Sequence, residues 1–109
     1  MQDRLEALLQ YFEYDPGDSF TRFALAREYQ KRGNTERALE FFEGLVRDTP
    51  DYVGTYYHLG KLYEQEGRKE EAKATYRRGI AAARRLRDVH TASELRDALL
   101  QAEGIGFDD

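Results

Sequence analysis

The chain is similar to itself at a spacing of 34 residues, and this internal repeat limits the folds open to it. The matching positions are apolar, small or turn-forming, which are the positions that two copies of one helical hairpin would share. A single hairpin cannot bury its apolar face alone, so successive copies are predicted to stack on one another. The identical pairs are Thr21 with Thr55, Leu25 with Leu59, Tyr29 with Tyr63, Gly33 with Gly67, Glu36 with Glu70, and Ala38 with Ala72.

Apolar residues recur throughout the chain at the spacing of one helix face. Between Tyr56 and Tyr63, for example, two tyrosines, a leucine and a glycine fall at positions i, i+3, i+4 and i+7. No segment alternates with a period of two, so strands are not expected. The pattern predicts an all-α fold of about six helices, over residues 2–14, 20–32, 36–48, 53–66, 69–85 and 89–103.

Capping residues separate these helices. Asp18 or Ser19 is predicted to cap the second helix and Asp88 the last, because short polar side chains accept hydrogen bonds from exposed N–H groups. Gly33 and Gly67 stand just past two helices, where the backbone turns left-handed. Gly60 is different, since it lies inside a helix, where glycine costs about 1 kcal/mol relative to alanine. We expect a second helix to pack closely against its bare backbone.

A period of 34 residues, with a small residue within the first helix, alanine in the second and an aromatic residue four positions later, resembles the tetratricopeptide repeat (TPR). In this chain Gly60, Ala72 and Tyr76 carry the pattern. The resemblance implies a right-handed α-α superhelix, or TPR solenoid. It divides one domain, residues 1–109, into a half-repeat helix (2–14), two full repeats (19–52 and 53–86), a capping helix (88–103) and a flexible tail (104–109).

Three arginines depart from the family pattern. Arg84 replaces the proline that closes the first copy at Pro50, so the fifth helix is predicted to continue without a break. Arg4 stands where the family has alanine and Arg96 where it has a small residue, and at both ends no neighbouring helix requires one. The resemblance makes the following residues framework: Leu25, Ala26, Tyr29, Ala38, Phe42, Tyr56, Leu59, Gly60, Tyr63, Ala72, Tyr76 and Gly79.

The composition excludes several classes of function. The chain has 17 basic and 21 acidic residues and a net charge of −4, which argues against a general nucleic-acid binder. No apolar run is long enough to span a membrane, and the charged N-terminus lacks a signal core, so the cytoplasm is the expected compartment. There is no cysteine, no serine–histidine–acid set and no phosphate loop. The chain is therefore not expected to be an enzyme or to hold a cofactor.

TPR ligands usually lie in the concave groove lined by the first helix of each pair, so the resemblance places a partner protein or peptide there. Both copies keep an aromatic residue and, four positions later, a cation: Phe23 with Arg27, and Tyr57 with Lys61. Such a surface would suit an acidic peptide with an apolar anchor. Alternatively, each cation only covers the ring on its own helix. The predicted groove residues are Phe20, Phe23, Arg27, Lys31, Tyr57, His58 and Lys61.

Three more specific functions can be considered for this chain, namely a chaperone clamp, a metal site and a nucleic-acid site, and none is favoured. The lysine and asparagine clamp with which some TPR domains hold the carboxylate of heat-shock chaperones is absent. A metal site at Tyr57, His58, His90 and Glu94 is not favoured, because two histidines without ligand spacing on one helix rarely bind a metal. The arginines between residues 77 and 87 are expected to form surface ion pairs rather than a nucleic-acid site.

A self-associating scaffold is the alternative function. With two complete repeats, the terminal helices are predicted to leave apolar side chains that a second copy of the chain would cover, or that pack within the monomer. The residues concerned are Leu9, Phe12 and Tyr14 at one end and Leu99, Leu100 and Phe107 at the other.

Overall fold

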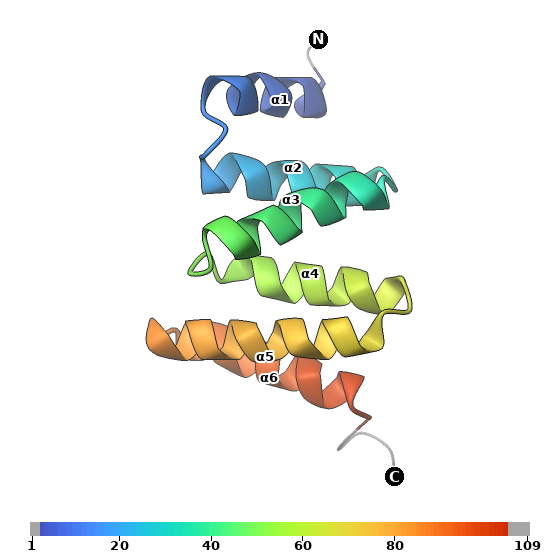
Figure 1. Cartoon of the computed structure of the whole chain (residues 1–109), viewed down its shortest axis with the longest axis vertical. Coiled ribbons are helices and arrows are strands. Elements are labelled where there is room, and N and C mark those ends of the chain that lie inside the picture. Colours follow the sequence, from blue (N-terminus) through green and yellow to red (C-terminus); the bar gives the residue numbers. More distant parts are fainter. Residues whose placement is uncertain (1–2, 105–109) are drawn as a thin grey trace. The chain divides into compact units, whose positions relative to one another are not determined.

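The structure is a computed structural model, and it describes residues 3–104. Six α-helices and no strand lie within this range, which confirms the predicted all-α class (Figure 1). Each helix begins and ends within two residues of its expected bounds. The helices are α1 (Arg4–Tyr14), α2 (Ser19–Lys31), α3 (Thr35–Asp48), α4 (Gly54–Gln65), α5 (Lys69–Arg85) and α6 (Val89–Ala102).

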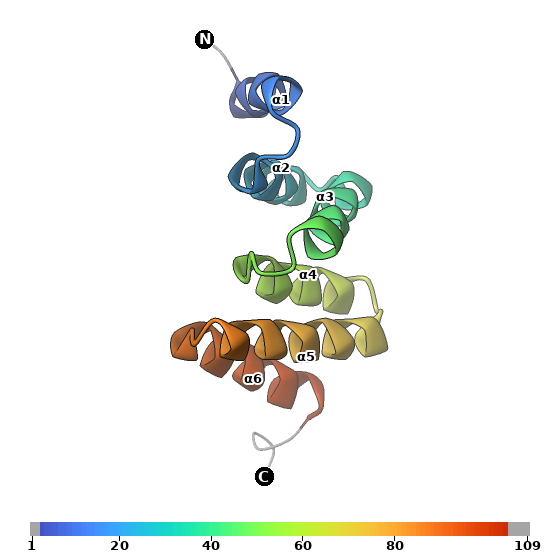
Figure 2. The ribbon, with the colours of Figure 1, turned by 60° about the vertical axis from the view of Figure 1, so that its left-hand side comes forward.

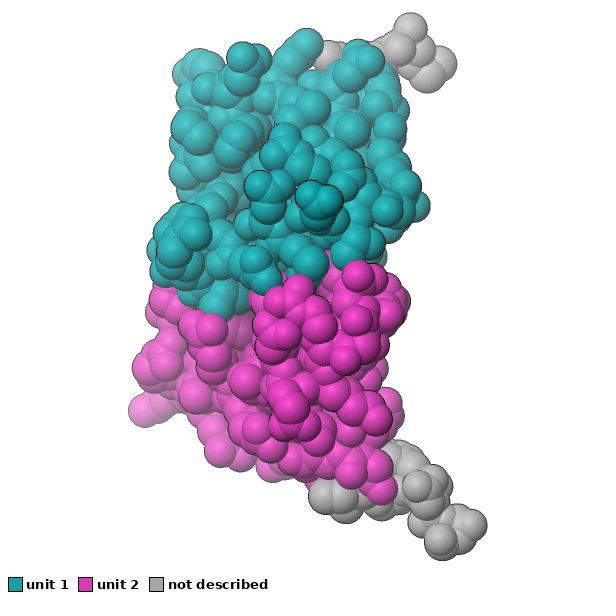
Figure 3. Space-filling view, turned by 45° about the vertical axis from the view of Figure 1, so that its right-hand side comes forward, with its two compact units in different colours: residues 1–49 teal, residues 50–109 magenta. Residues whose placement is uncertain are grey.

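The chain divides into two compact units, Met1–Thr49 and Pro50–Asp109, which are coloured separately in Figure 3. In the first unit α2 packs against α3, and α1 packs against α2 (Figure 1). In the second unit α5 packs against both α4 and α6 (Figure 2), and α4 also contacts α6. The assignment of residues 1–109 to a single repeat domain stays a prediction.

The core of the first unit is formed by the apolar stripes of its three helices. Leu25 and Phe42 are completely buried between α2 and α3. The ring of Phe41 stacks on Tyr29, with 6.0 Å between ring centroids, and meets Phe12 of α1 edge to face at 5.2 Å. Such aromatic pairs contribute about 0.5–1.5 kcal/mol beyond the area that they bury. The half-repeat helix α1 is therefore held by an aromatic cluster from both helices of the next pair.

The core of the second unit depends on two glycines. A Cβ at Gly60 of α4 would stand 2.2 Å from Cε1 of Tyr76, and a Cβ at Gly79 of α5 would stand 2.5 Å from Cβ of Tyr56. Each helix thus places a tyrosine against a glycine of the other. The predicted close approach at Gly60 is confirmed. Tyr56 is also fixed at its far end, because its hydroxyl donates a hydrogen bond of 2.6 Å to the carbonyl oxygen of Pro50.

The predicted N-caps at Asp18 and Asp88 are confirmed, and they have the same geometry. The Asp18 carboxylate accepts hydrogen bonds from the N–H of Thr21 at 2.9 Å and from its hydroxyl at 2.7 Å. The Asp88 carboxylate accepts from the N–H of Thr91 at 3.1 Å and from its hydroxyl at 2.8 Å. Both pairs leave fewer unsatisfied donors at the start of a helix.

The turns after α2, α4 and α5 also share one hydrogen-bond pattern, in which an N–H donates to the carbonyl oxygen five residues earlier. In the first two turns a glycine takes the left-handed position, Gly33 with φ 79° and Gly67 with φ 76°. In the third, after α5 has run on through Arg84 as predicted, the left-handed residue is Arg87, with φ 59°.

Candidate functional site

Four of the predicted groove residues lie together in the first unit. Phe20, Phe23, Arg27 and Lys31 share one face of α2, because they are spaced three to four residues apart. They line a cleft of about 300 Å³ between α1 and α2. The remaining lining residues are Arg4 of α1 and Ala24 and Glu28 of α2.

Glu28 and Arg4 are the charged residues of this cleft that the sequence did not predict as part of the site, and Glu28 is the buried one. Its side chain is only 8% exposed, and its two carboxylate oxygens face different arginines. Oε1 lies 3.3 Å from Nε of Arg4, and Oε2 lies 3.0 Å from Nε of Arg32. Arg4 is therefore more than a tolerated departure from the family pattern, because it links α1 to α2. The lining contains three cations, Arg4, Arg27 and Lys31, and one carboxylate, which is already paired with arginines. The net charge of the cleft is therefore positive.

The two phenylalanines of the cleft differ in accessibility. Phe20 is 65% exposed, at the first turn of α2. Phe23 is half-buried, and its ring meets the buried Phe42 edge to face at 6.1 Å. Phe23 therefore contributes to the core as well as to the cleft wall. Phe20 is the aromatic side chain that a partner can cover.

The other three predicted residues belong to α4 in the second unit. Tyr57 and Lys61 line a cleft of about 200 Å³, together with four residues of α6. His58 is not part of that lining, and its ring meets the neighbouring Tyr57 ring edge to face at 5.6 Å. The residues of α6 are Glu94, Asp97, Ala98 and Gln101.

Lys61 is engaged within its own helix. Its ammonium group lies 5.5 Å from the centroid of the Tyr57 ring and 3.8 Å from a carboxylate oxygen of Glu64. For this pair, the structure agrees with the alternative in which the cation covers the ring on its own helix. Glu94 and Asp97 of α6 line the same cleft, so its net charge is negative. The predicted residues of α2 therefore lie in a positively charged cleft, whereas Tyr57 and Lys61 of α4 lie in a negatively charged one.

Tyr76, which closes the α4–α5 contact, is kept neutral. Burial raises its pKa far above the ordinary value, and the hydrogen bond that its hydroxyl donates to Glu64 acts in the same direction. Burial likewise raises the pKa of Tyr56. Both phenols therefore serve as framework.

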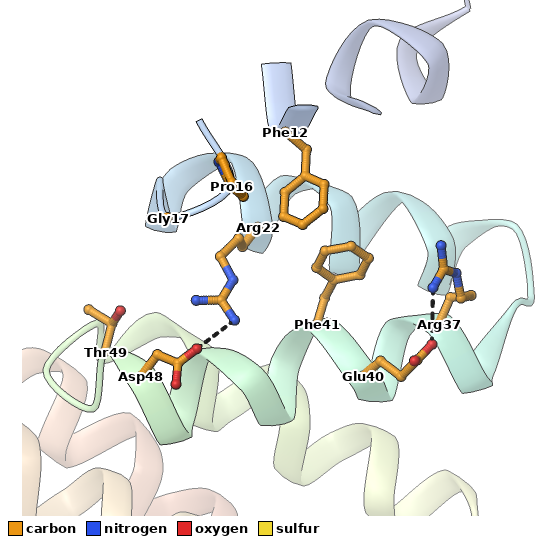
Figure 4. A pocket seen from close by; sticks show the side chains of 9 residues that line it. All are labelled: Phe12, Pro16, Gly17, Arg22, Arg37, Glu40, Phe41, Asp48 and Thr49. Atoms are coloured by element: carbon orange, nitrogen blue, oxygen red, sulfur yellow. Dashed lines mark hydrogen bonds and ion pairs between the residues drawn. The ribbon is translucent and has the colours of Figure 1, made fainter. Parts of the chain in front are cut away.

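A larger cavity of about 620 Å³ lies in the first unit, beside α1 and α3 (Figure 4). Its aromatic lining is the Phe12–Phe41 contact, and its charged groups are paired within it. Arg22 donates to Asp48 at 3.0 Å, and Arg37 lies 3.3 Å from Glu40. Hydrogen bonds from Arg47, and then from Arg22, lower the pKa of Asp48, which keeps it charged. The cavity therefore has no excess charge with which to select an ionic ligand.

The histidines do not meet in a metal site within the described part of the chain. Residues 3–104 contain no group of three or more histidine, cysteine, aspartate or glutamate side chains arranged to hold an ion. His90 lies 3.4 Å from Glu94 of the same helix. Over the same residues, no helix combines the length and the apolar character needed to cross a membrane.

The terminal residues considered for self-association differ in their contacts. Phe12 packs on Phe41 within the first unit. Tyr14 is 91% exposed. Leu9, Leu99 and Leu100 are half-buried, and Phe107 lies outside the described residues.

Two solved structures resemble this fold closely. The solution structure of a tetratricopeptide repeat domain protein from Salinibacter ruber shares 54% identity, with a TM-score of 0.80 over 87% of this chain and 96% of that one. The solution structure of a protein from Bordetella parapertussis has the same TM-score over 94% of this chain and 90% of that one. At 24% identity, the second comparison supports the fold alone.

Sequence comparison gives matches of the same kind. The chain is 28% identical to a TPR repeat-containing protein from Pseudomonas aeruginosa, over 72% of this chain and 75% of that protein. It is 33% identical over 77% of its length to the cellulose synthase operon protein C of Pseudomonas fluorescens, of which it spans 6%. Residues 29–95 match the model of the tetratricopeptide repeat. The chain therefore belongs to the tetratricopeptide repeat family.

Proposed function

We propose that this protein is a non-catalytic interaction module that binds an acidic peptide with an apolar anchor through the exposed face of α2. Proteins of the TPR family generally mediate protein–protein interactions and are typically not enzymes. We place this role in the cytoplasm, as the sequence suggests.

The observation that carries the proposal is the composition of the α1–α2 cleft. Arg4, Arg27 and Lys31 are cations, and the acidic Glu28 is buried and paired with arginines. Phe20 stands 65% exposed at the end of this surface. An aromatic side chain beside several cations favours a carboxylate-rich segment that also carries one apolar side chain.

We assign the α4 residues of the second unit a different binding preference. Tyr57 and Lys61 share their cleft with Glu94 and Asp97, so a strongly acidic segment is disfavoured there. With His58, they offer aromatic edges and polar groups that suit a neutral or weakly basic segment. The seven predicted residues then divide into one group on each unit, and the two groups have opposite charge preferences.

The test is fluorescence anisotropy with a labelled glutamate-rich peptide that carries one central leucine. Two further peptides replace the leucine with serine or the glutamates with lysine. We expect the first peptide to bind best, and the Arg27→Glu/Lys31→Glu protein to bind it at least about tenfold more weakly, because two attractive charges become repulsive. Lys69→Glu, an exposed charge reversal at the start of α5, is the matched control and should bind normally.

Equal binding of the acidic peptide by the double variant and the wild type would show that the α2 face is not the site. A preference for the lysine peptide would reverse the proposed polarity. Circular dichroism of each variant checks that the helices are intact.

Self-association is a second candidate, favoured by the outer face of α1. Tyr11 is 66% exposed, and with Ala7, Gln10 and the still more exposed Tyr14 it lines a cleft of about 430 Å³. A second copy would cover these tyrosines. Sedimentation velocity over a wide concentration range decides the question, since a mass that stays that of one chain throughout excludes a dimer.

A further inference from the structure

A cavity of about 490 Å³ at the turn between α5 and α6 is lined by three arginines. Arg84 belongs to the last turn of α5, Arg87 to the connecting turn, and Arg96 to the middle of α6. All three side chains are exposed. The other lining residues are Asp88, Val89, Ala92 and Ser93.

The side chains of these arginines form no hydrogen bond or ion pair with another described residue, in contrast to those of Arg77 and Arg85. Arg77 donates to Glu103 at 2.8 Å, and Arg85 donates to Asp51 at 2.6 Å. Arg77 and Arg85 are thus paired within the chain, whereas Arg84 lines the cavity together with Arg87 and Arg96. Like charges repel one another, so their grouping here favours an anion from outside.

Asp88 is the single carboxylate in the lining, and it already has a structural role. It caps α6 by accepting hydrogen bonds from the N–H and the hydroxyl of Thr91, which lower its pKa. Three cations therefore stand against one carboxylate. The cavity keeps an excess of positive charge.

The backbone of Arg87 gives a second, independent argument. Its φ of 59° is left-handed, and the corresponding residues of the two other turns are Gly33 and Gly67. A side chain is strained in this conformation, whereas glycine is not. The same turn can clearly be made by glycine in this fold, so the presence of arginine indicates that its side chain is needed.

Stabilisation of a helix end does not account for the whole set. Cations are favoured at the C-terminus of a helix by its dipole, which would explain Arg84 and Arg87. Arg96 lies in the middle of α6, far from either helix end, at a position where the family pattern has a small residue. The feature that Arg96 has in common with Arg84 and Arg87 is that it lines the same cavity.

We infer that this cavity binds the phosphate monoester dianion of a ligand that also carries an apolar group. One arginine satisfies a single carboxylate through two parallel hydrogen bonds. Three guanidinium groups match the charge and the three terminal oxygens of a phosphate monoester better. Val89, a lining residue that is 78% exposed, supplies apolar contact beside the arginines. This site is independent of the peptide proposed for α2.

The test is a titration of the full chain, followed by the backbone amide shifts of residues 84–96 in NMR spectra. One arm uses inorganic phosphate, and another uses a phosphoserine peptide with a neighbouring leucine beside its unphosphorylated form. Sodium chloride at equal ionic strength is the blank. We expect phosphate-dependent shifts centred on the α5–α6 turn.

Three variants make the inference specific. Arg96→Gln and Arg87→Gly should each weaken binding about tenfold, the effect of losing one charged hydrogen-bonding group. Arg87→Gly should at the same time raise the thermal midpoint, because it relieves the left-handed strain. Arg77→Gln, at a paired arginine of the same helix, should bind as the wild type does.

The two arms identify the source of the phosphate. Tighter binding of the phosphopeptide than of phosphate indicates a phosphorylated protein, and equal binding would overturn the apolar part of the inference and leave a site for the phosphate group alone. The inference is wrong if neither ligand shifts these amides more than the blank does. It is also wrong if Arg77→Gln weakens binding as much as Arg96→Gln, because that would be the effect of general charge.

Discussion

Thr21 and Thr55 hold the same position in the two repeats, 34 residues apart, but their hydroxyl groups differ in hydrogen bonding. The Thr21 hydroxyl donates to the Asp18 carboxylate at 2.7 Å. Thr55 is completely buried, and within the described residues its Oγ1 has no hydrogen-bond partner. The residue that corresponds to Asp18 in the second copy is Tyr52, so the acceptor has been lost while the threonine remains.

Thr55→Val should therefore stabilise the protein. Valine has nearly the same shape and removes a buried hydroxyl that water would otherwise solvate in the unfolded chain. We expect the free energy of unfolding to rise by up to about 1 kcal/mol. Urea denaturation followed by circular dichroism measures the change.

Thr21→Val is the matched control at the equivalent position, and it should destabilise the protein, because the Asp18 cap loses a hydrogen bond. Opposite signs for the two substitutions are the expected result. A loss of stability in Thr55→Val would mean that its hydroxyl has a partner after all.

Gly60→Ala should destabilise the second unit, although alanine is the better helix former. The new methyl group would stand 2.2 Å from the ring of Tyr76, whose hydroxyl is bonded to Glu64 and whose displacement disturbs the α4–α5 contact. Overpacking of this kind costs about 1–3 kcal/mol, which exceeds the helix-propensity gain of about 1 kcal/mol. Thermal and urea unfolding both report the difference.

Gly44→Ala provides the comparison within α3. There the new methyl group would meet Nη2 of Arg22 at 2.6 Å, the end of a long side chain that can shift, although Nη2 also donates a hydrogen bond to Asp48. We expect a smaller loss of stability than in Gly60→Ala, because an arginine side chain can reorient more easily than the packed Tyr76 ring. If Gly44→Ala and Gly60→Ala were equally destabilising, the rigidity of the Tyr76 ring would not be the reason.

The two aspartate caps predict a loss of stability in acid. Hydrogen bonds from the hydroxyl and the N–H of Thr21 lower the pKa of Asp18 below its ordinary value of 3.8, and those from the N–H and hydroxyl of Thr91 do the same for Asp88. A carboxyl with a lower pKa in the folded chain stabilises the fold above its unfolded pKa. That contribution disappears as the pH falls through the folded pKa.

Asp18→Asn/Asp88→Asn tests this assignment, because asparagine caps helices about as well as aspartate but does not titrate here. The double variant should lose less stability than the wild type between neutral pH and the region below 3.8. Alanine at the same two positions should lower stability at every pH. Parallel pH profiles for the wild type and the asparagine variant would contradict the role of the caps.

Much of the fold follows from local sequence. Helix ends are set by hydrogen bonds that span only a few residues, so they can be predicted from the sequence without tertiary structure. The residues concerned are Asp18, Gly33, Gly67 and Asp88. The 34-residue period then predicts the stacked hairpins, and Gly60 predicts a close contact with a second helix. The partner ring at that contact, Tyr76, comes from the next helix and is seen only in the structure.

The candidate site was less predictable, because its chemistry depends on neighbouring helices. The residues that share the exposed face of α2 follow from helical spacing alone. The pairing of Glu28 with Arg4, which makes the α2 cleft basic, needs α1 beside it. The acidic groups of α6 next to Lys61, which give its cleft the opposite sign, depend on the packing of α4 against α6.

The sequence by itself determined the repeat, the helices and the stripe that each helix buries, since periodicity and capping act over one or two turns of chain. Only the tertiary structure decided which charges meet. It paired Arg77 with Glu103 and gathered Arg84, Arg87 and Arg96 around one cavity. Electrostatic character depends on distances between helices, and those distances are set by packing.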